Sequence, residues 1–324
     1  MNEQKLIEML QWKRPSSSFA AKMFGQHYLE PIFGSPDSHG NYIHIINDEH
    51  GNDPNLCFTA HYDTVHRDEG FQDVSVSHGI AYVEDSDCLG ADCTTGIWLI
   101  LGMIEANIPG VYVIHADEEI GCVGSQALIK DNPVWLSFID AVISFDRYGE
   151  DSIITHQMGC RTASDDFAES LADALQMPMQ PDPNGSFTDS NEYVHDVSEC
   201  TNVSVGYQRQ HSANETQDLV HAVRLMDALI NADWSKLVFK RPRGLNYSDK
   251  YWGSYMGSGL SRYRDSDYRE EMTARHLLTI INDYPEEVVD WFMSYGVDAE
   301  ELARELNLEL PSNIIYEMTE EAAY

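Results

Sequence analysis

The sequence predicts an α/β protein: a mixed, mostly parallel sheet with helices on both faces, followed by a small helical C-terminal appendage. Segments with the length and β-branched content of strands alternate with helical patterns, and this alternation is typical of a sheet covered on both faces. The composition changes after residue 239, where the predicted strands have ended. The strand segments are 42–46, 55–60, 110–116, 138–145 and 201–207.

Helical patterns occupy the segments between several of these strands. Residues 94–107 are apolar nearly all round, which predicts a buried helix, and residues 123–131 predict a shorter one. The helix predicted at 164–176 begins with Ser164 as its N-cap and has aspartates in its first turn, where the helix dipole favours negative charge. A further amphipathic helix is expected at 215–232.

The composition divides the chain into three regions. Residues 1–239 hold all of the predicted strands. Residues 240–266 are rich in Gly, Ser, Tyr and Arg without any periodicity, which indicates a linker. Residues 267–324 contain three short helical patterns and form the predicted C-terminal unit, whose apolar face could be covered by a protein partner or by a second copy of the chain.

The charge balance excludes two classes of partner. Lys and Arg number 20 against 54 Asp and Glu, a formal net charge of −34, which repels nucleic acids and anionic membranes. No apolar run reaches the roughly 18 residues of a membrane helix. The N-terminal "MNEQKLIEMLQWKR" is an amphipathic helix rather than a signal peptide, so we expect a cytoplasmic protein. The six cysteines include no C-x-x-C pair, which predicts buried free thiols rather than disulfides.

Acidic and histidine side chains stand where the predicted strands end and where the buried helix begins. Because the ligand crevice of an open α/β sheet lies beyond the carboxyl ends of its strands, we expect these side chains to converge. Carboxylates packed together repel one another, and divalent metal ions relieve that repulsion. Histidine and carboxylate ligands suit Zn²⁺, with Mn²⁺ or Co²⁺ possible, and more than four ligands indicate two metal ions. The residues are His61, Asp63, Asp92, Glu118, Glu119, Asp146 and His211.

The order of these motifs resembles that of the co-catalytic di-zinc exopeptidases. H-x-D, G-A-D before a helix, E-E-x-G, a strand-end Asp and a late His follow one another over about residues 40–232. The resemblance is to aminopeptidases and tripeptidases of the M20, M28 and M42 type. Too few residues separate Asp146 from His211 to form an inserted lid domain, so the chain resembles the lidless members.

The resemblance implies a ligand role for five residues and makes residues 1–239 a di-metal peptidase domain. Asp92 is expected to bridge the two metal ions. His61 and Asp146 are expected to complete one site. Glu119 and His211 are expected to complete the other. Taken singly, each of these residues would more often be a surface histidine, an N-cap or a turn residue, and it is their ordered occurrence that favours the metal site.

The resemblance also implies roles for two residues that are not ligands. Asp63 is expected to hold the ring of His61 in its ligating tautomer. Glu118 is expected to act as general base, taking a proton from the attacking water and passing it to the leaving amine. A cis peptide bond is expected after Asp92, where Cys93 stands in place of the Asp or Asn that often follows.

The sequence assigns several neighbouring residues alternative roles. The donor to the oxyanion of the tetrahedral intermediate stays open among Arg147, Tyr193 and Tyr207. Asp189 either supports the metal ligands or belongs to a plain turn. Glu215 either orients the late histidine or caps the helix that follows it.

The predicted function is therefore a metal-dependent hydrolase of peptide bonds, foremost an aminopeptidase or small-peptide exopeptidase that uses a two-zinc-activated water and Glu118 as base. One alternative is an amidohydrolase that removes N-acyl groups from amino acids. The other is a non-catalytic binding or scaffold protein on the same fold. The expected substrate is accordingly a peptide or an acylated amino acid.

Overall fold

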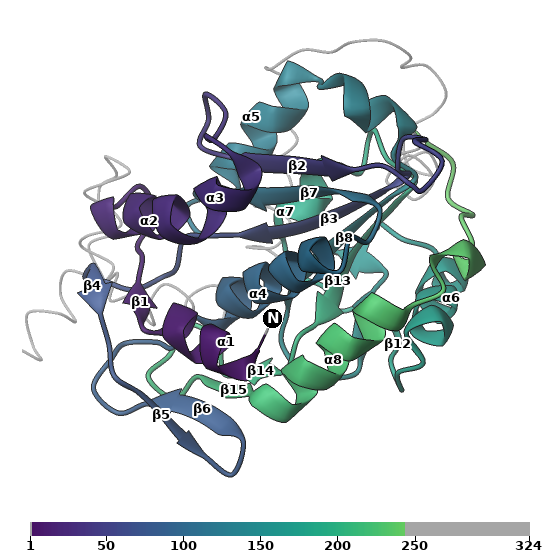
Figure 1. Ribbon diagram of the computed structural model, residues 1–324. Coiled ribbons are helices and arrows are strands. Elements are labelled where there is room, and N and C mark those ends of the chain that lie inside the picture. The colour runs from purple at the N-terminus through teal and green to yellow at the C-terminus, as the bar shows by residue number, and fades with distance from the viewer. Residues whose placement is uncertain (1, 244–324) are drawn as a thin grey trace, which may run out of the picture. The chain divides into compact units, whose positions relative to one another are not determined.

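The computed structural model describes residues 2–243, and Figure 1 shows their arrangement. Most of the predicted linker at 240–266 lies outside the described residues, as does the whole predicted helical region at 267–324. The expected association through that C-terminal region stays a prediction. The catalytic region predicted for residues 1–239 falls almost entirely within the described part.

A seven-stranded sheet forms the centre of the fold, in the order β12-β9-β13-β8-β3-β7-β2. Its four central strands run parallel, and they are β13 (Glu199–Ser204), β8 (Ala141–Arg147), β3 (Leu56–His61) and β7 (Gly110–His115). β2 (Tyr42–Ile46) adds an antiparallel edge beside β7. On the other side β9 (Ser152–Ile154) pairs antiparallel with β13, and β12 (Gln180–Asp182) pairs parallel with β9. The predicted mixed, mostly parallel sheet is confirmed.

Each face of the sheet has its own apolar core, because successive strand residues point to opposite faces. Phe58 and Phe145 face a core to which α1 (Glu3–Leu10), α4 (Ala91–Glu105), α6 (Asp165–Leu175) and α8 (Leu219–Asn231) contribute residues. Cys57 and Val142 face the second core, with Leu128 of α5 (Val123–Asp131). Figure 1 shows α5 on one side of the sheet and α4 and α8 on the other. The prediction of helices on both faces is confirmed.

The remaining elements are short and lie around this sheet. The helical ones are α2 (Phe19–Phe24), η1 (Gly25–Leu29), α3 (Glu30–Phe33), η2 (Val134–Phe138), α7 (Asp189–Glu192) and η3 (Trp234–Lys236). A second sheet has the order β14-β15-β6-β5, made of Tyr207–Gln208, Thr216–Asp218, Ile80–Val83 and Val74–Ser77. Two two-stranded pairs complete the list, β1 (Trp12–Lys13) with β4 (Gly70–Phe71) and β10 (His156–Gln157) with β11 (Cys160–Arg161).

Two predicted helices are shorter than their sequence patterns. The helix expected from residue 215 begins at Leu219, because residues 216–218 pair with β6 as strand β15 and Asp218 then caps the helix. The N-terminal helix ends at Leu10, because residues 12 and 13 pair with β4. In both cases a long-range strand pairing, which no local pattern announces, ends the helical segment.

Helix α4 is buried along most of its length and positions one predicted ligand. Its residues from Ala91 to Met103 are buried, as the all-round apolar pattern predicts. Gly96 permits this close packing, because a Cβ atom there would overlap the backbone carbonyl oxygen of Phe145 in β8. The helix therefore presses its first turn, which holds Asp92, toward the carboxyl end of β8.

The structure of residues 2–243 bears on two expectations from composition, one about the cysteines and one about membrane helices. All six cysteines are free thiols, and all except Cys160 are buried, which confirms the prediction of buried free thiols. Among the helices in this part of the chain, none combines the length and apolar character that a membrane crossing requires.

Candidate metal centre

The seven predicted site residues meet at the carboxyl edge of the parallel strands. His61 is the last residue of β3, and Asp146 lies near the end of β8. Glu118 and Glu119 follow β7, Asp92 stands in the first turn of α4, and His211 comes from the loop between β14 and β15. Strands that run parallel bring their ends to one edge, which is why residues distant in sequence come together here.

The distances among these side chains fall into two groups that match the two expected ligand sets. In one group, Nε2 of His61 lies 3.6 Å from Oδ1 of Asp146. In the other, Nε2 of His211 lies 2.9 Å from Oδ2 of Asp92 and 3.3 Å from Oε1 of Glu119. Ligand atoms of Asp92 lie within 4.8 Å of those of both histidines. Asp92 therefore lies near both groups, and so does Glu119, whose ligand atoms are also within 4.8 Å of those of both histidines.

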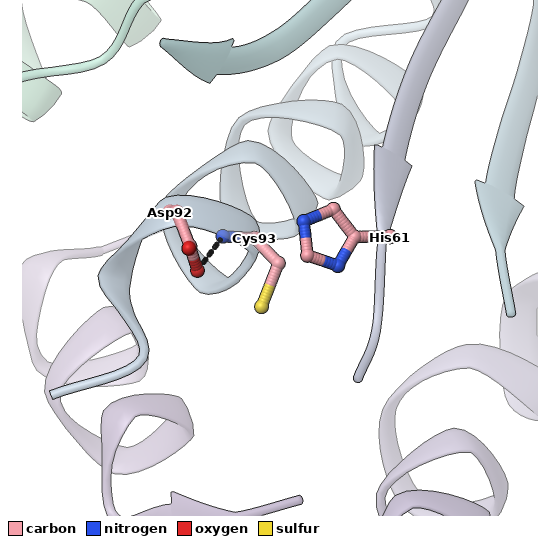
Figure 2. A group of neighbouring side chains, drawn as sticks. All are labelled: His61, Asp92 and Cys93. Carbon is pink, nitrogen blue, oxygen red and sulfur yellow. Dashed lines mark hydrogen bonds between the residues drawn. The ribbon is translucent and has the colours of Figure 1, made fainter. Parts of the chain in front are cut away.

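Figure 2 shows His61 on its strand facing Asp92 and Cys93 at the start of α4. The peptide bond between Asp92 and Cys93 is trans, like every other peptide bond in residues 2–243, so the expected cis bond is wrong. Helix α4 begins at Ala91, which gives both residues regular helical backbone with trans bonds. The N–H of Cys93 donates to Oδ1 of Asp92 at 2.8 Å and holds that carboxylate in place.

Asp63 makes hydrogen bonds both to His61 and to the backbone of the two glutamates. Its Oδ1 accepts hydrogen bonds from Nδ1 of His61 at 3.2 Å and from the backbone N–H of Glu118 at 3.1 Å. Its Oδ2 accepts the backbone N–H of Glu119 at 3.1 Å. Burial would raise the pKa of Asp63, but the hydrogen bond and charge of His61 and the hydroxyl of Ser16 outweigh it and hold that pKa below its usual value. Asp63 is thus an anion that fixes the His61 ring.

Glu118 stands beside the ligand pairs with a side chain only 12 % exposed. Its Oε2 lies 4.0 Å from Nε2 of His61. Burial raises the pKa of Glu118 well above its usual value, the nearby imidazole opposes that rise, and the carboxylates of Asp146 and Asp189 add to it. A carboxyl group with a raised pKa can take up a proton and release it again near neutral pH.

The charges of the centre fit divalent cations. Six carboxyl groups, those of Asp63, Asp92, Glu118, Glu119, Asp146 and Asp189, gather around two imidazoles and are buried or nearly so. Oε1 of Glu119 is buried and makes no hydrogen bond of good geometry within residues 2–243. Burial and the Asp92 charge raise the pKa of Glu119 to about 7. Two dications with oxygen and nitrogen ligands would neutralise this excess negative charge and use the orphan oxygen.

Protons should therefore compete with metal ions for this centre. Burial lowers the pKa of His211, but the carboxylates of Asp92 and Glu119 outweigh it and raise that pKa to about 11. Since a metal ion binds only the neutral imidazole, binding near neutral pH must displace a proton, and affinity should increase as the pH rises toward about 11.

The expected result is proton release on zinc binding, measured by titration calorimetry in buffers of different ionisation enthalpy. The variant His211→Ala should release fewer protons than the wild-type chain. An affinity for zinc that does not change between about pH 6.5 and about pH 9 would contradict this account.

Three residues considered as oxyanion donors are engaged elsewhere. Arg147 pairs with Asp182, with Nη2 3.3 Å from Oδ2. The hydroxyl of Tyr193 is buried and bonds to Nε2 of His115 at 3.0 Å. The hydroxyl of Tyr207 donates to the backbone oxygen of Asp146 at 3.0 Å, which braces a predicted ligand. The oxyanion donor accordingly stays open.

Two polar residues near His61 have contrasting positions. Asp189 is buried beside the centre rather than in an exposed turn, and burial raises its pKa to about 8. His66 is also buried, but both of its ring nitrogens have partners. Nδ1 bonds to Oγ1 of Thr64 at 2.8 Å, and Nε2 bonds to Oε1 of Gln72 and to the carbonyl oxygen of Cys88 at 3.0 Å. His66 therefore has a structural role.

Glu215 caps α4, a helix more than a hundred residues away in sequence, and not the helix that follows it. Its carboxylate accepts the backbone N–H groups of Leu89, Gly90 and Ala91 at 2.9, 3.1 and 2.8 Å. These are donors at the start of a helix, which have no partner within the helix itself. The cap fixes the turn that presents Asp92.

Removal of this cap should destabilise the fold. Glu215→Ala leaves buried N–H groups without partners, so we expect the free energy of unfolding to fall by about 2 kcal/mol or more. Chemical denaturation of the metal-free chain measures it, with the exposed Glu84→Ala as the matched control. If Glu215→Ala lowers the free energy of unfolding no more than Glu84→Ala does, water replaces the carboxylate as hydrogen-bond partner without loss of stability.

Ser16 and Thr188 each donate a hydrogen bond to a carboxylate of the centre, and no sequence motif assigns either of them that role. The hydroxyl of Ser16 donates to Oδ2 of Asp63 at 2.6 Å, and that of Thr188 donates to Oδ2 of Asp146 at 2.8 Å. Thr188 directly precedes Asp189, which the sequence already indicates as a candidate support of the ligands, whereas Ser16 is a common residue type without a motif of its own. Only the folded chain brings each of them to a predicted ligand or to the carboxylate that orients one.

Comparison with known proteins is consistent with this arrangement. Residues 41–197 match the model of peptidase family M28. No curated protein matches the sequence. The crystal structure of aminopeptidase PepT from Bacillus cereus superposes with a TM-score of 0.59 at 14% identity, covering 71% of this chain and 98% of that chain.

Two further solved structures are similar. A tripeptidase from Staphylococcus aureus has a TM-score of 0.58 at 14% identity, covering 71% of this chain and 97% of that one. The TET1 peptidase of Pyrococcus horikoshii has a TM-score of 0.55 at 13% identity, covering 72% of this chain and 100% of that one. At such identities the likeness shows a shared fold.

Proposed function

We propose that this chain, which belongs to the zinc exopeptidase superfamily, is a metal-dependent aminopeptidase or small-peptide exopeptidase. One observation carries the proposal. Two groups of imidazole and carboxylate ligands share Asp92, and a further buried carboxyl group, that of Glu118, stands beside them. A binding or structural role would not call for that additional carboxyl group.

Five side chains would hold the metal ions. His61 and Asp146 would bind one, Glu119 and His211 the other, and Asp92 both. Two bound divalent ions would supply Lewis-acid chemistry, polarising the scissile carbonyl and lowering the pKa of water. The donor set of imidazoles and carboxylates favours Zn²⁺, and Mn²⁺ or Co²⁺ would also suit it.

Glu118 would move the proton. Its carboxylate would take a proton from the attacking water and would then deliver it to the nitrogen of the leaving amine, so that the same group acts first as base and then as acid. The raised pKa of Glu118 supports this cycle, because a carboxyl group of ordinary pKa holds a proton too weakly to donate it near neutral pH.

Asp63 would hold the ring of His61 and the backbone of the two glutamates in place without touching substrate. Its anionic carboxylate holds the Nδ1–H of His61, which leaves Nε2 of that ring free to face the centre. The same carboxylate anchors the backbone of Glu118 and of Glu119, so the base and one ligand keep a fixed relation to the ring.

A peptide with a free α-amine is the substrate that the electrostatics favour. The protonated amine is a cation, and the centre and the whole chain are strongly acidic, with a net charge of −34. The test is hydrolysis by the zinc-loaded chain of aminoacyl amides, dipeptides and tripeptides, each offered free and N-acetylated.

Preferential hydrolysis of the free-amine compounds is the expected result. Preference for the acetylated compounds would select an N-acyl-amino-acid amidohydrolase instead. Hydrolysis of neither set, by a chain that carries its metal ions, would contradict the proposal and favour a binding or scaffold role.

Self-association belongs to the same proposal. The TET1 peptidase of Pyrococcus horikoshii assembles into a tetrahedron or a large octahedral shell. We propose that this chain also forms oligomers, and light scattering after size-exclusion chromatography measures the assembly directly. A molar mass equal to that of one chain, 36.7 kDa, would contradict it.

A further inference from the structure

A short N-terminal segment, residues 14–17, lies against the candidate metal centre although it precedes the part of the chain that matches the peptidase family. We call it the N-terminal arm. Its backbone pairs with Thr64, which follows the ligand-bearing strand: the N–H of Thr64 donates to the carbonyl oxygen of Arg14 at 2.8 Å. The N–H of Arg14 donates in return to Oγ1 of Thr64 at 3.0 Å.

The side chain of Arg14 ties two parts of the centre together. It is completely buried, and its Nε donates to the carbonyl oxygen of Tyr62 at 2.9 Å, between His61 and Asp63. Its Nη2 contacts Sγ of Cys93 at 3.1 Å and Oγ1 of Thr94 at 2.7 Å, in the first turns of α4. The guanidinium thus spans from the loop after β3 to the helix that holds Asp92.

The two serines of the arm each hold a carboxylate at a strand end. The hydroxyl of Ser16 donates to Oδ2 of Asp63 at 2.6 Å. The backbone N–H and the hydroxyl of Ser17 bond to the carboxylate of Asp117 at 2.6 and 2.8 Å. Asp117 has a φ of +54°, a left-handed conformation in which Glu118 follows directly. The arm therefore holds both Asp63, which orients His61, and the turn at Asp117 that precedes the proposed base, Glu118.

Ser16 matters most among these contacts because, among residues 2–243, only Ser16 and His61 donate a side-chain hydrogen bond to Asp63. Oδ1 of Asp63 is held by the imidazole and by one backbone N–H. In the described part of the chain, Oδ2 accepts from the N–H of Glu119 and from the hydroxyl of Ser16, and the bond from Ser16 is the shortest of the four. Without that hydroxyl, Oδ2 keeps a single hydrogen bond, from the N–H of Glu119, and we expect the carboxylate to hold the His61 ring less firmly.

We propose that Ser16 is a positioning residue for the metal centre, acting on His61 through Asp63. The inference rests on the proposed function, since it assumes that His61 binds a metal ion. It goes further by assigning part of the binding energy for that ion to a segment that precedes the matched region. Partners that orient metal-binding histidines typically change metal affinity by 10- to 100-fold when they are removed.

The experiment compares zinc affinity in four full-length chains: wild type, Ser16→Ala, Ser16→Thr and Ser18→Ala. Ser18 is the matched control. It loses the same hydroxyl two residues away, where Oγ accepts the N–H of Ala21 as the N-cap of α2 and does not touch Asp63. Dissociation constants come from competition with a chromophoric chelator, and the melting temperature Tm of each metal-free chain reports its stability separately.

For one of the two bound ions, Ser16→Ala should raise the zinc dissociation constant about tenfold or more. Ser16→Thr, which keeps the hydroxyl, should restore most of that affinity. Ser18→Ala should lower Tm and leave the dissociation constants unchanged.

Wild-type zinc affinity in Ser16→Ala, whatever its Tm, would overturn the positioning role and leave the proposed function intact. An equal loss of affinity in Ser18→Ala would overturn it as well, because the effect would then be one of general stability. A wild-type chain that binds no zinc would overturn the proposed function and this inference together.

Discussion

Glu118→Gln is expected to reduce kcat by about 10²- to 10⁴-fold and to leave the metal content unchanged. The amide has nearly the same volume as the carboxylate, so it preserves packing in a nearly buried position. It cannot accept a proton from water, which removes the proposed transfer to the leaving amine. Because the proposed ligands are five other side chains, both metal ions should remain bound.

The measurement pairs steady-state kinetics on a free tripeptide with metal analysis of the same sample. Glu49→Gln is the matched control, since it makes the same change on a side chain that is 86 % exposed. A Glu118→Gln chain that keeps full activity would eliminate Glu118 as the base. One that loses a metal ion along with its activity would show instead that Glu118 is a ligand.

Asp92→Asn is expected to weaken the binding of both metal ions at once. Asp92 is the carboxylate proposed to bind both ions, and its ligand atoms lie close to those of both histidines. The amide keeps an oxygen that can accept the N–H of Cys93, as Oδ1 of Asp92 does at 2.8 Å, so the start of α4 should stay folded. The substitution would also remove a negative charge from a position that both proposed metal ions share, where that charge would attract each ion most strongly.

His211→Ala provides the comparison, because this histidine belongs to only one of the two ligand groups. Its side chain is 43 % exposed, so the fold should tolerate the change. The content of zinc, measured by mass spectrometry after dialysis, should fall from two ions to one in His211→Ala and below one in Asp92→Asn. Retention of two ions by Asp92→Asn would contradict the bridging role.

The sequence patterns predict that the candidate site residues gather at one edge of the sheet, but they do not predict which residues support them. Each proposed ligand stands at the end of a strand or the start of a helix, and the topology of a parallel sheet brings such positions to one edge. The position of His61 could be predicted because an apolar run that ends in a histidine is visible locally. That of Asp92 could be predicted because it opens a helix with an apolar pattern.

The supports escaped prediction because they depend on contacts between distant parts of the chain. Glu215 caps a helix 124 residues away from it, and no pattern around Glu215 shows this. Ser16 contacts Asp63 because β1 and β4 pair and direct the N-terminal arm across the strand ends. The expected cis bond after Asp92 was wrong because the regular start of α4 imposes trans geometry there.

Peptide hydrolysis by this chain should depend on two metal ions held by these side chains. The most direct test of this dependence measures zinc per chain and hydrolysis of a free-amine tripeptide in one purified sample, before and after chelation and after zinc is restored. We expect two zinc ions per chain and hydrolysis that disappears with the chelator and returns with zinc. Hydrolysis that survives complete removal of the metal, or a chain that binds two zinc ions and hydrolyses no peptide, would contradict it.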